Sequence, residues 1–67
     1  MEEGIVERES LRTAIGILPE RERRVILLRY YRGMTQEQTA RLLGVSQVQV
    51  SRIERRTMER LRRKLEE

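Results

Sequence analysis

Cysteine and histidine are both absent from this 67-residue chain, and its only aromatic residues are two tyrosines. Without cysteine the chain can form no disulfide, and without both residue types it lacks the usual ligands of zinc clusters. No pair of carboxylates stands where it would line a cleft, and the two missing residue types are the commonest general base, histidine, and a common nucleophile, cysteine. We therefore expect no enzyme activity, no metal site and no cofactor.

Long apolar runs are also missing. No stretch approaches the ~18 residues that a membrane-spanning helix requires, and the acidic start at Glu2 and Glu3 does not resemble a signal peptide. We expect a protein of the reducing cytoplasm with no membrane partner. A chain of this length forms one domain of modest stability. That domain is expected to span residues 1–67, with a flexible lead-in at residues 1–5.

Basic residues are abundant and concentrate in the second half of the chain. There are 15 basic and 11 acidic residues, giving a net charge of +4 and a pI of about 10.6. Residues 1–20 carry two arginines and five glutamates, whereas residues 46–64 carry seven basic residues and two glutamates. This division indicates two surfaces with different partners, and the basic one meets the electrostatic criterion for nucleic acid. A solvated, salt-bridged helix is the alternative explanation of such a charge run.

Apolar residues recur at helical spacing, and no segment alternates with period two. A first helix is predicted over about residues 6–17. A second is predicted from Pro19 to about Arg32, because proline suits a first turn and Gly33 can take the left-handed conformation that ends a helix. The first helix carries an apolar stripe made of Leu11, Ala14, Ile15 and Leu18.

Two further helix starts are better marked. Thr-Gln-Glu-Gln from Thr35 predicts a capping box, and Ser-Gln-Val-Gln from Ser46 repeats the pattern. Apolar residues at steps of three and four then continue from Val50 to Leu65, which predicts one long last helix. The expected fold class is all-α, a small four-helix domain with a long C-terminal helix.

The last two helices are joined by a turn of only three or four residues, so they must cross steeply. Ala40 supplies a small side chain where they pass closest, and Gly44 supplies a residue that tolerates positive φ. Alone, this pair is more often ordinary helix packing followed by a C-cap. Together with the apolar and polar faces that follow, it predicts a helix-turn-helix over about residues 35–56. The apolar residues are Leu42, Leu43, Val45, Val50 and Ile53, and the polar ones are Gln47, Gln49, Ser51 and Arg52.

The polar face of residues 46–56 suits the edges of DNA bases. A glutamine amide offers a donor and an acceptor to adenine, and arginine offers a fork to guanine. Thr35 and Ser46 stand at helix N-termini, where backbone N–H groups attract phosphate. Arg55 and Arg56 extend the positive surface towards the strands, whereas the basic residues after Arg56 fit a solubilising helix face as well.

Two stretches carry a family resemblance: LPERERRVILLRYY at residues 18–31 and TQEQTARLLGVSQVQVSRIE at residues 35–54. They resemble region 4 of sigma-70-family sigma factors, and the similarity covers about residues 11–65. Residues 46–52 are most similar to the sporulation and stress factors of Gram-positive bacteria. The resemblance implies a sequence-specific domain that binds the −35 element of double-stranded promoter DNA for transcription initiation. It also implies docking on the β flap of RNA polymerase.

By this resemblance, base-reading positions fall on Gln47, Val48, Ser51 and Arg52. Positions at the DNA backbone fall on Arg21, Arg29, Thr35, Glu37 and Ser46, with Arg56 near a phosphate or a flanking base. The charge pattern, rather than the resemblance, adds Arg55 to these backbone positions. Housekeeping members have Arg-Glu in place of Gln47-Val48 and Arg-Gln in place of Ser51-Arg52, so a different −35 sequence is expected. The family domain that melts the −10 element has no counterpart here. We therefore expect part of a longer sigma factor or an unusual stand-alone relative.

The run from Val25 to Leu28 is continuously apolar and cannot all face one small core. Ile26 and Tyr30 share one helix face, and Leu27 and Tyr31 share another. Either both faces are buried, or Leu27 and Tyr31 form a partner surface for the polymerase flap or an anti-sigma protein. Two other functions remain open: a dimeric helix-turn-helix repressor or activator on palindromic sites, and a protein-binding module targeted by an anti-sigma factor.

Overall fold

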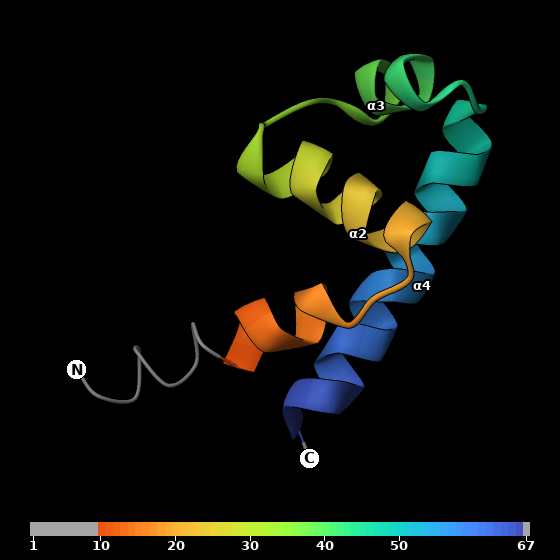
Figure 1. The fold of residues 1–67 in the computed structure, drawn as a ribbon. Coiled ribbons are helices and arrows are strands. Elements are labelled where there is room, and N and C mark those ends of the chain that lie inside the picture. The colour runs from red at the N-terminus through yellow and green to blue at the C-terminus, as the bar shows by residue number, and fades with distance from the viewer. Residues whose placement is uncertain (1–9, 67) are drawn as a thin grey trace.

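The computed structural model describes residues 10–66, and every regular element in that range is helical (Figure 1). The predicted all-α class is therefore confirmed for this part of the chain. The expected lead-in at residues 1–5, the start of the first helix and four of the five glutamates of the acidic front lie outside the described residues. The elements are a helix at residues 10–16, α2 (Glu20–Ile26), η1 (Leu27–Tyr31), α3 (Gln36–Leu43) and α4 (Gln47–Glu66).

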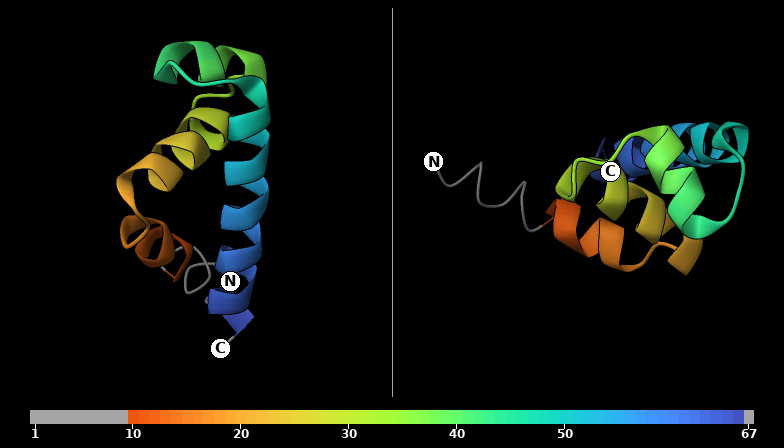
Figure 2. Two further views of the ribbon diagram at one scale, coloured as in Figure 1. Left: turned by 90° about the vertical axis from the view of Figure 1, so that its right-hand side faces the viewer. Right: turned by 90° about the horizontal axis from the view of Figure 1, so that it is seen from above.

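The long helix α4 forms the spine of the molecule, and the other helices pack along it (Figures 1 and 2). The short helix α3 crosses its N-terminal end, α2 lies against its middle, and residues 10–16 lie towards its C-terminal end. Within residues 10–66, none of the helices combines the length and the apolar character that crossing a bilayer requires.

The helix that begins at Glu20 changes its hydrogen-bonding pattern before it ends. After Ile26 the backbone widens into the π-helix η1, where the N–H of Arg32 donates to the carbonyl of Leu27 at 3.0 Å. Gly33 then takes φ 70°, as predicted for the residue that ends this helix. The sequence predicted an ordinary α-helix to about Arg32, so the π turn is a correction. Such turns are rare and occur mostly as single-turn bulges within α-helices.

Two apolar clusters form the core, and α2 contributes to both. Ile26 packs in a cluster beside residues 10–18 and the C-terminal half of α4, whereas Val25 packs in a cluster between α3 and the N-terminal half of α4. The apolar run is explained by this position, because consecutive residues of α2 face different neighbours. The first cluster contains Leu11, Ala14, Ile15, Leu18, Ile26 and Leu61; the second contains Val25, Ala40, Leu43, Val45, Val50 and Ile53.

One predicted core contact is wrong. Leu42 was expected to pack between the helices of the helix-turn-helix, but 63% of its surface is exposed, while Leu43 is half-buried. The opposite occurs on α4, where the charged Glu54, for which no burial was predicted, is buried between Val50 and Thr57. Both departures bear on the surfaces described next.

Candidate DNA-binding surface

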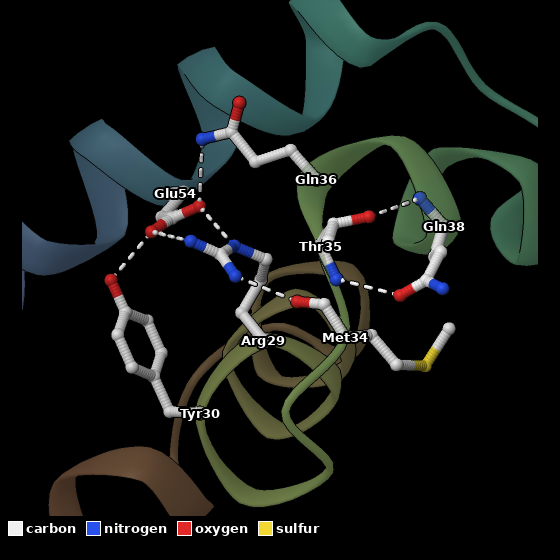
Figure 3. A network of polar contacts seen from close by, with 7 residues as sticks. All are labelled: Arg29, Tyr30, Met34, Thr35, Gln36, Gln38 and Glu54. Carbon is white, nitrogen blue, oxygen red and sulfur yellow. Dashed lines mark hydrogen bonds and ion pairs between the residues drawn. The ribbon is translucent and has the colours of Figure 1, made fainter.

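The capping box at the start of α3 is present as predicted (Figure 3). The backbone N–H of Gln38 donates to the Thr35 hydroxyl at 3.0 Å, and the N–H of Thr35 donates to the Gln38 side-chain oxygen at 3.0 Å. Both residues are exposed, and so is Glu37 in the first turn. The N-terminus of α3 is therefore rigidly formed and open to solvent.

The turn between α3 and α4 also matches the prediction. Gly44 takes φ 73° and ψ 32°, and its N–H and that of Val45 both donate to the carbonyl of Ala40. Ser46 caps α4: its hydroxyl accepts from the N–H of Gln49 at 3.1 Å, and its own N–H donates to the Gln49 side chain at 3.0 Å. Three residues thus join the two helices, and their geometry leaves little freedom at the start of α4.

The four expected base-reading residues all lie on exposed surface of α4. Its buried residues are Val50, Glu54, Thr57 and Leu61. Because each residue advances about 100° around a helix, Val48 and Arg52 project from the side opposite this buried face. Val48 keeps 57% of its surface exposed although it is apolar. The exposed set is Gln47, Val48, Ser51 and Arg52.

Three of the expected DNA-contacting arginines come together at one groove. Arg21 at the start of α2 and Arg52 and Arg56 on α4 line it, together with Gln49. The one acidic group lining it, Glu22, is paired with Arg60 at 2.7 Å, which neutralises its charge locally. The groove therefore presents uncompensated positive charge beside the residues expected to read bases. Arg55 is exposed on α4 but does not line this groove.

Arg29 differs from the other expected phosphate contacts because its guanidinium points into the protein (Figure 3). Its Nε donates to a carboxylate oxygen of Glu54 at 2.9 Å, one terminal nitrogen approaches the other oxygen at 3.4 Å, and the second donates to the carbonyl of Met34 at 2.6 Å. Tyr30 and Gln36 also donate to the Glu54 carboxylate. We call Arg29, Tyr30, Gln36 and Glu54 the Glu54 network.

The Glu54 network keeps its charges at neutral pH. Burial disfavours the charged carboxylate, but hydrogen bonds from Arg29, Tyr30 and Gln36 outweigh it and hold the pKa of Glu54 below its ordinary 4.5. The hydrogen bond to Glu54 also raises the pKa of Arg29 and of Tyr30. A charged carboxylate, a charged guanidinium and a neutral phenol thus stabilise one another.

The Glu54 network was not predicted, although the sequence held one indication of it. Glu54 stands four residues after Val50 and three before Thr57, at a core position of the apolar stripe. A carboxylate at such a position is buried only with partners. A search for those partners upstream would have drawn attention to Arg29.

A second surface lies between η1 and α3. Leu27, Leu28, Leu42 and Leu43 form an apolar groove, with Arg24 and Arg32 also lining it. Leu27 is 37% exposed, and the unexpected exposure of Leu42 places it in this groove. Tyr31, the other expected partner residue, is exposed but does not line it.

Known proteins resemble the chain over most of its length. Residues 14–63 match the family model for sigma-70, region 4. The RNA polymerase sigma-F factor of Kitasatospora aureofaciens is 49% identical over 59 residues, which cover 88% of this chain and 20% of that protein. The RNA polymerase sigma factor SigF of Mycobacterium tuberculosis (strain H37Rv) is 48% identical over 62 residues, with 92% and 24% covered.

A third relative, the RNA polymerase sigma-F factor of Bacillus subtilis, is 43% identical over 61 residues, covering 91% of this chain and 24% of its own length. The chain thus spans between a fifth and a quarter of the length of these relatives. They confirm the predicted similarity to the sporulation and stress type of factor. With the family model matching from the first described helix to near the end of α4, the chain belongs to the sigma-70 region 4 family.

Proposed function

We propose that this chain binds the −35 element of promoter DNA as part of a bacterial sigma factor and thereby helps direct transcription initiation. One observation carries the proposal. The N-terminal half of α4 presents Gln47, Val48, Ser51 and Arg52 on the side away from the core, and capped turns fix its start. A helix held in this way fits the major groove, where amides, arginine and an exposed aliphatic side chain can address different bases.

The positions of the groups that could bind phosphate support the same orientation of α4 in the major groove. Arg21 and Arg56 line the groove beside Arg52, so the DNA strand on that side of the major groove would meet positive charge. The capped N-termini at Thr35 and Ser46 offer backbone N–H groups to phosphate, and Glu37 and Arg55 lie exposed nearby along their helices. Arg29 reaches a phosphate only by leaving Glu54 and Met34. We therefore expect Arg29 to contribute less to phosphate binding than Arg21 and Arg56.

The test is selection of binding sites from random double-stranded DNA, followed by titration of the enriched sites. Asymmetric sites bound by a monomer support the proposal. Palindromic sites bound by a stable dimer would replace it with a free-standing repressor or activator. Gel filtration of the same sample gives the oligomeric state independently.

The apolar groove at Leu27 and Leu42 supports a second part of the proposal, docking on the polymerase β flap. Four leucines line the groove with two arginines, which suits an apolar helix that carries acidic residues. An anti-sigma protein is the alternative occupant of the same groove. Measuring the affinity of the chain for an isolated β-flap domain tests the docking separately from DNA binding. A factor of this kind works with polymerase in the cytoplasm.

A further inference from the structure

The Glu54 network joins three elements through one carboxylate (Figure 3). Arg29 and Tyr30 come from η1, Gln36 is the first residue of α3, and Glu54 belongs to α4. Both carboxylate oxygens are engaged: one accepts from Arg29 at 2.9 Å and from Gln36 at 3.0 Å, and the other accepts from Tyr30 and approaches Arg29. The Glu54 side chain is only 11% exposed, so solvent offers it few substitutes.

The network restrains a motion that the apolar core permits. Val25, Ala40 and Val50 meet in the cluster between α2, α3 and α4, and such contacts are not directional. A small roll of α4 about its axis would preserve much of that contact. It would, however, break the hydrogen bonds at Glu54, which require defined distances and angles. In some proteins, buried polar groups of this kind select one arrangement among several of similar packing.

We infer that Glu54 is a positioning residue for DNA recognition, which sets the roll of α4 relative to the N-terminus of α3. The inference rests on the proposed function. Arg52 stands two residues before Glu54 on the same helix and projects to the opposite side, so a roll that displaces the carboxylate also displaces the guanidinium. Arg29 and Gln36 act through Glu54, and the whole network holds the exposed face of α4 in one orientation.

The test compares sequence preference in the full 67-residue chain and its Glu54→Gln variant. Preference is the ratio of the dissociation constants for a single-base variant of the selected site and for the site itself. One aligned bidentate base contact is worth about fivefold or more in this ratio. We expect Glu54→Gln to lose about that much preference at the base pair that Arg52 contacts. The assay is run well below the melting temperature of the parent chain and of each variant compared with it.

Two controls separate positioning from charge and from stability. Glu20→Gln removes the same charge and breaks a single ion pair, with Arg24 at 2.8 Å, on the exposed surface of α2. Ile15→Val weakens the other apolar cluster without touching the Glu54 network. Both variants are expected to keep the preference of the parent chain. Glu54→Asp, which keeps the carboxylate, is expected to recover part of the preference lost in Glu54→Gln.

Arg29→Met distinguishes positioning from a direct phosphate contact. If Arg29 acts through Glu54, its loss lowers preference, and adding it to Glu54→Gln lowers preference no further. If Arg29 instead binds phosphate, its loss weakens binding to all sequences alike. It also lowers the slope of log K against log salt concentration by about one, both in the parent chain and in Glu54→Gln. That second pattern overturns the role given to Arg29.

The outcomes separate this inference from the proposed function. If the parent chain shows no sequence preference, both fail. If the parent chain discriminates and Glu54→Gln discriminates as well as it does, the positioning role alone is overturned. Should Glu54→Gln fail to fold, Gln36→Met removes one donor from the carboxylate and leaves the pair with Arg29 intact. A smaller loss of preference at the same base pair is then expected, and unchanged preference overturns the inference.

Discussion

Replacing Gly44 by valine isolates the cost of one backbone conformation. Gly44 ends α3 at φ 73°, and a Cβ built at this position meets no atom within 4 Å. A Cβ at this position therefore causes no steric overlap. The left-handed conformation itself costs an L-residue roughly 1–2 kcal/mol, and β-branching places valine at the upper end.

The expected loss in the free energy of unfolding is therefore about 1–2 kcal/mol, which lowers the melting temperature of so small a domain by roughly 4–16 °C. Thermal or urea unfolding followed by circular dichroism measures it. Gly44→Asn is the matched control, because asparagine tolerates positive φ better and should lose less. Equal melting temperatures for Gly44→Val and the parent chain would show that the turn does not impose this conformation.

Five other substitutions test four separate features. Arg52→Ala should cost about 1–3 kcal/mol of binding free energy at one base pair of the selected site. Arg56→Ala should weaken binding to all sequences and lower the slope of log K against log salt concentration by about one. Uniform weakening of binding by Arg52→Ala would contradict its expected base-reading role. Leu27→Glu should weaken binding of the β flap in a pull-down and spare DNA binding, and an equal loss of thermal stability would mean that Leu27 is core. Because folding lowers the pKa of Glu54, its contribution to stability is present above pH 4.5 and is lost as the pH falls through the pKa of the folded state. In urea unfolding, the free energy of unfolding of Glu54→Gln should therefore fall less steeply in acid than that of the parent chain. The buried Thr57 hydroxyl has no hydrogen-bond partner within the described residues, so Thr57→Val should stabilise the domain by about 1 kcal/mol in urea unfolding, and a loss would point to an unseen partner.

The features predicted correctly from the sequence are those that depend on neighbouring residues. The capping boxes at Thr35 and Ser46 need only side chains three positions away, and both are present. Gly33 and Gly44 both adopt the predicted left-handed conformation. A short-range pattern of this kind specifies where helices begin and end, so the helix-turn-helix and its exposed face follow from the sequence alone.

The features that were missed depend on residues far apart in the chain. The carboxylate of Glu54 is held by partners 18 to 25 residues upstream, and no local pattern contains both ends of such a contact. Leu42 was misplaced for a related reason. Helical spacing gives the faces of α3 but not the side on which its neighbours pack, and α3 lies at the end of α4 (Figure 1).

A buried Glu54 with an arginine partner is a poor choice for stability alone. Desolvating both charges costs several kcal/mol, and apolar residues of similar size often stabilise a core as well or better. In a chain this small, where the total stability is modest, such a group needs another reason to be present. Glu54 lies on the helix that carries Val48 and Arg52 and receives hydrogen bonds from the two elements preceding that helix. Its directional contacts specify the orientation of the exposed face, which is what sequence recognition requires and what an apolar side chain at the same position would not supply.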